Sequence, residues 1–237
     1  MAVRQVVTVG PLAAASANNI ALSQTPTSGT PVALNGSTVS GGVATLDKQR
    51  RVLVTFGSES SGRTIQFTGA NAAGQTVQET VAIPASAAGS VFTQTDFLTI
   101  TKALPGGGGF TAAVTIGTNG TASSPWQGVT EFITPVNVSA NCVVSGAVIY
   151  TVETTNDSID APLPTSTVGA PYGPLGAIMG VPTPFVLNPN LQGQAANASG
   201  MLNGNPPQPI RAWRLVLNSG TGSVTATGIQ GGIIQGH

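Results

Sequence analysis

The sequence predicts an all-β protein made of two antiparallel β-sandwich or jelly-roll-like domains with long irregular loops. Three observations indicate this class. Short runs rich in Val, Ile, Thr and Phe alternate apolar and polar residues, which is the period of a strand with one buried face. The runs end at Gly, Pro, Asn and Ser, in a chain with 31 glycines and 17 prolines. No segment sustains a helical period, and the length of 237 residues suffices for two domains of about 110 to 120 residues.

The first half of the chain is predicted to be a series of strands that stop at turn residues. Residues 52–56 and 64–68 alternate most clearly across a Ser/Gly-rich turn, and they favour an antiparallel hairpin. Only residues 12–17 and 85–88 favour helix, for a turn or two. The other predicted strands of this half are residues 5–9, 19–23, 30–34, 39–46, 76–83, 92–103 and 110–117.

The second half begins near residue 122, within a small-residue connector at 119–125. The predicted domains are therefore 1–121, with an extended N-terminal arm, and 122–237. Residues 129–138 and 142–155 are predicted strands, and 210–228 is predicted to be a hairpin. Residues 160–209 form a Pro/Gly-rich insertion that is too long for an ordinary connection. It is expected to be either an ordered, irregular contact with a neighbour or a partly disordered segment.

The scarcity of charge excludes most kinds of chemistry. Only 7% of the residues are charged, against about a quarter in a typical soluble domain. The chain has one cysteine, Cys142, in an apolar run that predicts a buried hydrophobe, and one histidine, His237, at its end. We therefore expect no enzymatic activity, no catalytic residue, no cofactor and no metal site.

Charge and hydropathy also limit the expected partners. Eight basic and eight acidic residues give a net charge of zero, so nothing attracts nucleic acid or an acidic membrane. No run of about 18 apolar residues is present to span a bilayer. The N-terminal segment has no continuous apolar core like that of a secretory signal peptide, because Pro11, Ser16 and Asn18 interrupt it. Synthesis and assembly in the cytoplasm are expected.

Several local groups were weighed as sites. Glu153, Asp157 and Asp160, with Asn156 nearby, favour a solvated acidic turn over a Ca²⁺ site, because the required turn glycine is absent.

The basic cluster Lys48, Arg50 and Arg51 favours a solvated entry to a strand, or else salt bridges across a subunit interface. The four glycines at 106–109 favour a flexible loop over a phosphate-binding loop, because neither a Lys-Ser/Thr pair nor a helix follows them. The alternative of a glycan-binding or depolymerising module would rely on Trp126 and Trp213 with Asp157 or Asp160.

Most of the chain outside residues 160–205 resembles a family of structural proteins from the virions of tailed double-stranded DNA bacteriophages. The resemblance is carried by residues 12–26, 34–36, 50–52, 62–74, 78–81, 114–117, 121–126, 148–155, 210–215 and 223–227. These motifs are compositional and moderately specific.

The resemblance implies a non-enzymatic virion protein, assembled in the host cytoplasm and located in the particle. A capsid decoration or cement subunit of the head is expected, with a tail, neck or fibre component as the alternative. The expected partners are the major capsid protein or other virion proteins and copies of the chain itself, with neither nucleic acid nor membrane. Segments 1–30 and 160–209 are expected to be the contact arms.

Overall fold

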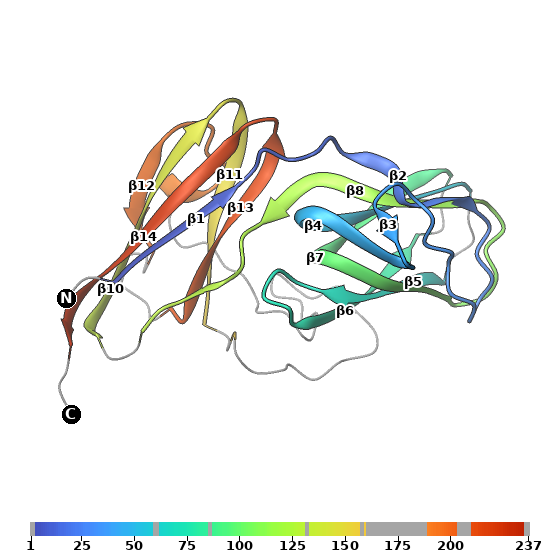
Figure 1. The fold of residues 1–237 in the computed structure, drawn as a ribbon, viewed down its shortest axis with the longest axis horizontal. Helices are drawn as coiled ribbons and strands as arrows, with labels where there is room; N and C mark the ends of the chain where they lie inside the picture. The colour runs from blue at the N-terminus through green and yellow to red at the C-terminus, as the bar shows by residue number, and fades with distance from the viewer. Residues whose placement is uncertain are drawn as a thin grey trace. The chain divides into compact units, whose positions relative to one another are not determined.

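The computed structural model describes residues 3–58, 62–84, 87–130, 133–156, 159, 189–202 and 210–234. These residues form fourteen β-strands and one short 3-10 turn, η1 (Pro189–Leu191), and no helix among them is long and apolar enough to cross a membrane (Figure 1). The predicted all-β class is confirmed, with antiparallel sheets that enclose apolar cores.

The chain divides into two compact units. Residues 13–120 form one, which we call the central unit. The residues up to Leu12 and the described residues from Thr121 onward form the other, which we call the terminal unit. The division between Gly120 and Thr121 lies next to the boundary expected from the sequence. The first twelve residues differ from the expectation, because they belong with the C-terminal half and not with residues 13–120.

The terminal unit is a sandwich of two antiparallel layers. Its four-stranded sheet has the order β1 (Val3–Val9), β14 (Ser223–Ile234), β10 (Ile133–Ser145) and β12 (Ala198–Met201) (Figure 1). The other layer is built on β11 (Val148–Thr155) and β13 (Ala212–Gly220), and β9 (Gln127–Gly128) and the end of β8 (Val114–Ser123) pair with β13. The core between the layers includes Cys142, Tyr150, Trp213, Leu215 and Val224, all fully buried.

Strand alternation explains this core. On β10, Val138, Ala140 and Cys142 are buried at every second position, and Val224 and Ala226 face the same way on β14. The predicted burial of Cys142 is confirmed. Burial raises the pKa of the Cys142 thiol to about 11, so the thiol is protonated and unreactive at neutral pH.

Glycines close one end of this sandwich. The turn between β13 and β14 packs directly on the turn between β10 and β11, and the backbone N–H groups of Thr221 and Gly222 both donate to Ala147 O, each at 3.0 Å. A Cβ on Gly222 would collide with the carbonyl oxygen of Ser145. The turn sequences therefore require glycine because two backbones touch.

The central unit contains β2 (Ser16–Gln24), β3 (Val39–Ser40), β4 (Val43–Phe56), β5 (Arg63–Ala70), β6 (Thr76–Ile83), β7 (Gly89–Gly106) and most of β8. Its strands follow the order β8-β4-β7-β5-β6, with β2 on β8 and β3 on β4. The described core consists of side chains from this unit, among them Ile20, Val54, Phe67, Phe97 and Ile116.

Two predicted hairpins are wrong, although their strands exist. β4 and β5 do not pair with each other, because the 18-residue β7 lies between them and pairs with both. β13 and β14 are joined by a tight turn but belong to different layers of the terminal unit. The predicted strand at 30–34 is also wrong, since this segment is irregular and Val32 N donates to Ala103 O.

The two expected contact arms are integrated into the units where the structure describes them. β1 is a strand of the terminal unit and β2 is a strand of the central unit. Within the insertion, residues 160–188 and 203–209 lie outside the described residues. Residues 189–202 pack on their own unit: Leu191 and Leu202 are buried, and Gln194 pairs with Tyr150 through two backbone hydrogen bonds.

Candidate functional site

Only part of the acidic group predicted at the end of β11 lies within the described residues. Glu153 pairs with Arg214 on the neighbouring strand, its Oε2 lying 2.7 Å from both Nε and Nη2. Asn156 is exposed, and Asp157 and Asp160 lie outside the described residues. No group of three potential metal ligands occurs among the described His, Cys, Asp and Glu residues.

The aromatic residues considered for glycan binding are mostly internal. Trp213 is fully buried, and its indole N–H donates to Gln5 Oε1 at 2.9 Å. Tyr150 is also fully buried, and its hydroxyl donates to Ala196 O at 2.9 Å. Trp126 is half-buried and stacks with the Arg214 guanidinium, 4.7 Å from the ring centroid. Within the described residues, the predicted Trp126–Trp213 pair therefore presents no two-ring platform.

The basic cluster is also mainly internal, so the expected solvated entry to β4 is wrong for Arg50. That side chain is buried and donates to Ala13 O at 2.9 Å, to Asp47 Oδ1 at 3.0 Å and to Asn119 O. Arg51 lies 3.7 Å from Asp96 Oδ1 and beside the Phe92 ring. Only Lys48 is exposed. An interface salt bridge from Arg50 is excluded by its burial.

The predicted flexible loop at Gly106–Gly109 has a fixed contact. Gly107 and Gly108 have positive φ, and the Arg63 side chain donates to Gly107 O at 2.7 Å. The loop is followed by β8 and not by a helix, which agrees with its exclusion as a phosphate-binding loop.

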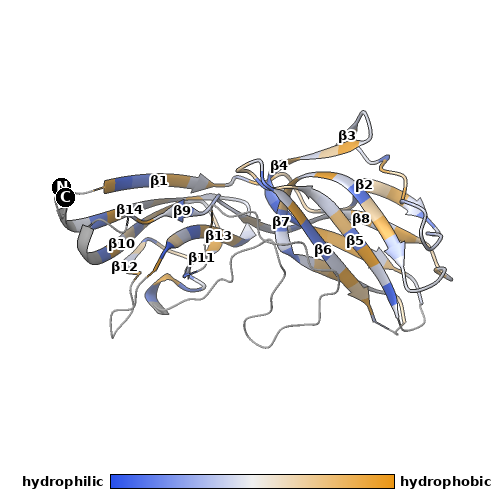
Figure 2. Cartoon of the chain, turned by 90° about the horizontal axis from the view of Figure 1, so that it is seen from below, coloured by the Kyte–Doolittle hydropathy of each residue, from blue (hydrophilic) through white to orange (hydrophobic). Residues whose placement is uncertain are grey.

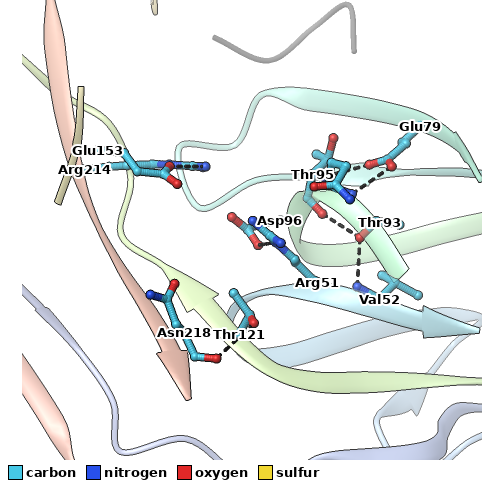
Figure 3. Close-up of polar contacts among 11 residues, drawn as sticks. Arg51, Val52, Glu79, Thr93, Thr95, Asp96, Thr121, Glu153, Arg214 and Asn218 are labelled. Atoms are coloured by element: carbon cyan, nitrogen blue, oxygen red, sulfur yellow. Dashed lines mark hydrogen bonds and ion pairs between the residues drawn. The ribbon is translucent and has the colours of Figure 1, made fainter. Parts of the chain in front are cut away.

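Sequence reasoning missed a buried polar cluster at the irregular part of β7. The Glu79 carboxylate accepts from the backbone N–H groups of Gln94, at 2.8 Å, and Thr95, at 2.7 Å (Figure 3). Thr93 Oγ1 accepts from Val52 N at 2.9 Å and donates to Thr95 O at 2.7 Å. These contacts satisfy backbone groups where the β4–β7 register shifts between Arg51 and Leu53. The cluster is structural, because it occupies the interior.

The remaining candidate is a surface, the outer face of the four-stranded sheet. The registers place fourteen described side chains on it: Arg4, Val6 and Thr8 on β1; Ser223, Thr225, Thr227 and Ile229 on β14; Asn137, Ser139, Asn141, Val143 and Ser145 on β10; and Ser199 and Met201 on β12. Val6, Val143, Met201 and Ile229 are large apolar residues that are 42 to 52% exposed. Arg4 carries the only charge of the fourteen. Figure 2 shows hydrophilic and hydrophobic positions side by side on the strands of this sheet.

This face can bind another neutral surface and has no chemistry of its own. Hydroxyl, amide and aliphatic groups bury without the desolvation penalty of ions, and they attract no charged ligand at long range. The scarcity of charge in the sequence therefore leaves one face of a four-stranded sheet nearly uncharged. Composition alone did not locate it, because the face appears only when the strand registers are known.

Comparisons with known proteins place no relative beside this chain: no family model, no curated protein and no solved structure matches it.

Proposed function

We propose that this chain is a non-enzymatic structural protein of a virus particle, a decoration or cement subunit of a bacteriophage head. The observation that carries the proposal is the outer face of the four-stranded sheet, with one charge among fourteen described side chains and four exposed large apolar ones. Exposed apolar surface of this kind is typical of protein–protein contact. The resemblance of the sequence to virion structural proteins is the reason for proposing a phage particle as the location of this contact.

The interior is consistent with this role. Three of the buried charged residues, Arg50, Glu79 and Arg214, bind backbone atoms or a neighbouring carboxylate and so serve the fold. A cement subunit stabilises a shell by binding its assembled form, so that the binding energy adds to shell stability by mass action. Neutral contacts of this kind keep their strength when salt concentration changes.

The proposal is tested by quantitative mass spectrometry of purified particles, with the major capsid protein as internal reference. A head decoration subunit is expected at hundreds of copies per particle, and loss of the protein should lower the temperature at which particles release DNA. A copy number of about a dozen or a few dozen, set by the symmetry of a neck, tail or fibre, would support the alternative location. Absence from particles would contradict both.

A further inference from the structure

We propose that the β1 edge of the terminal unit pairs with β1 of a second copy of this chain. The two strands would run antiparallel about a two-fold axis at Val6, and the two four-stranded sheets would become one continuous sheet. The proposal deepens the adhesive role proposed above and rests on it in choosing a second copy as the partner.

The first argument is that β1 is the least protected edge in the described sheets. It pairs only with β14 there, and its sequence, Val-Arg-Gln-Val-Val-Thr-Val, has no Pro, Gly, Lys or acidic residue and one charge, Arg4, near its start. Natural edge strands are usually short, covered, or marked by charge or proline. The other edges fit that pattern. β12 has four residues, β3 and β9 have two each, and β11 is covered at Tyr150 by Gln194. β2 is covered by the segment that follows it, since Gly36 N donates to Ile20 O and Thr38 N to Asn19 O, and β6 has an inward Glu79 and ends before Pro84.

The second argument is that β1 is already held in a binding conformation. Gln5 accepts from the Trp213 indole and donates to Gly128 O at 2.8 Å. Thr8 and Thr225 share a hydrogen bond of 2.9 Å between their hydroxyls, and Val9 is buried in the core. A strand fixed in this way loses little conformational entropy when another strand adds to it.

The third argument is that β1 is complementary to itself. With Val6 opposite Val6 of the second copy, Arg4 lies opposite Thr8, and Gln5 lies opposite Val7. The two Arg4 side chains are then separated by about 13 Å along the strands, so no like charges face each other. Val6 is 52% exposed in the single chain, and pairing would cover it.

Cysteine cross-linking tests the register directly. The native Cys142 is buried, so a cysteine placed at position 6 is the accessible thiol. Val6→Cys is expected to form a covalent dimer under mild oxidation or with a short cross-linker that has two thiol-reactive ends, since directly opposed Cβ atoms lie about 5 Å apart. Thr8→Cys, the matched control on the same face, is expected to form no covalent dimer by itself and to cross-link when mixed with Arg4→Cys.

Sedimentation equilibrium separates edge pairing from packing between faces. Val6→Lys is expected to weaken self-association of the full chain at least about tenfold, because the proposed register places the two lysines directly opposite each other at the new edge. Val143→Lys lies at a position equally exposed but on the interior strand β10, and it is expected to leave self-association of the chain unchanged.

Two results would overturn the proposal: equal cross-linking of Val6→Cys and Val143→Cys, or a chain that stays monomeric at all concentrations. A monomer found at hundreds of copies in particles would overturn only this inference and would leave the proposed function standing.

Discussion

Glu79 shows how the few charged residues of this chain are used. Its carboxylate binds two backbone N–H groups at the irregular part of β7, where strand pairing cannot satisfy them. Burial raises the pKa of Glu79, and this effect exceeds the lowering effects of the Gln94 and Thr95 hydrogen bonds and of Arg51. A buried acid with a raised pKa holds its proton more tightly in the folded chain than in the unfolded chain.

This linkage predicts the pH dependence of stability. The contribution of Glu79 is fully present below its ordinary pKa of 4.5 and is lost as the pH rises through the raised value. Glu79→Gln has no titrating group, and its amide resembles the protonated carboxyl in having one acceptor oxygen, so we expect the two chains to be closest in stability at low pH. As the pH rises, the native chain should lose stability relative to Glu79→Gln, measured by urea unfolding between about pH 3.5 and 7.

Asp47 provides a control with the opposite sign. Burial acts to raise the pKa of Asp47, but hydrogen bonds from Ala13 N and Arg50 and the charge of Arg50 lower it below the ordinary value of 3.8. The stability that the Asp47 carboxylate contributes to the folded chain is present above that pKa value and is lost as the pH falls below it. The free energy of unfolding of Asp47→Asn should therefore fall furthest below that of the native chain at neutral pH. Parallel pH profiles for the two variants would contradict the assignment.

At the scale of elements, the turn between β13 and β14 gives a prediction about close backbone contact. A Cβ at Gly222 would meet the Ser145 carbonyl and the Gly146 backbone. Gly222→Ala is therefore expected to destabilise the terminal unit by at least about 2 kcal/mol, measured by chemical denaturation. Gly231→Ala on the same strand is the control, because nothing lies within 4 Å of its Cβ and its φ is ordinary. Equal effects of the two substitutions would contradict the packing explanation.

Strand positions could be predicted from the sequence, whereas strand partners could not. The alternation of Val52, Val54 and Phe56 gave both the strand and its buried face correctly. The partner of that strand depended on β7, whose two halves pair with β4 and β5 after a change of register. Such a change is stabilised by polar groups distant in sequence, such as Glu79 and Gln94, and no local pattern reveals it.

The same limit explains the errors about charge and surface. Arg50 was expected at a solvated strand entry, and nothing in the sequence predicted burial of Arg214 within the 210–228 segment, yet the structure buries both against oxygen acceptors. The candidate face depends on registers among four strands that span nearly the whole chain, from Val3 to Ile234. Composition indicated that a neutral surface should exist, but only the pairing of β1 with β14 showed where it lies.

At the scale of the whole molecule, the chain builds two apolar cores that share no residue. The described core of the central unit runs from Ile20 to Ile116, and that of the terminal unit joins Val9 to residues from Ala122 to Ala226. The terminal unit thus depends on a strand from one end of the sequence pairing with one from the other end. Closing such a long loop costs entropy, which the buried side chains must offset.

Separate cores predict separate responses to core substitutions. Phe67→Ala removes a fully buried ring that contacts Phe97 edge-on, and Leu215→Ala creates a cavity in the terminal unit. Each substitution should lower the free energy of unfolding of its own unit by about 2–5 kcal/mol. Hydrogen exchange followed by mass spectrometry should show faster exchange in β4, β5 and β7 for the first variant, and in β10, β11, β13 and β14 for the second. Uniform acceleration along the whole chain in either variant would mean that the two cores unfold together, and the division into two stability units would then be wrong.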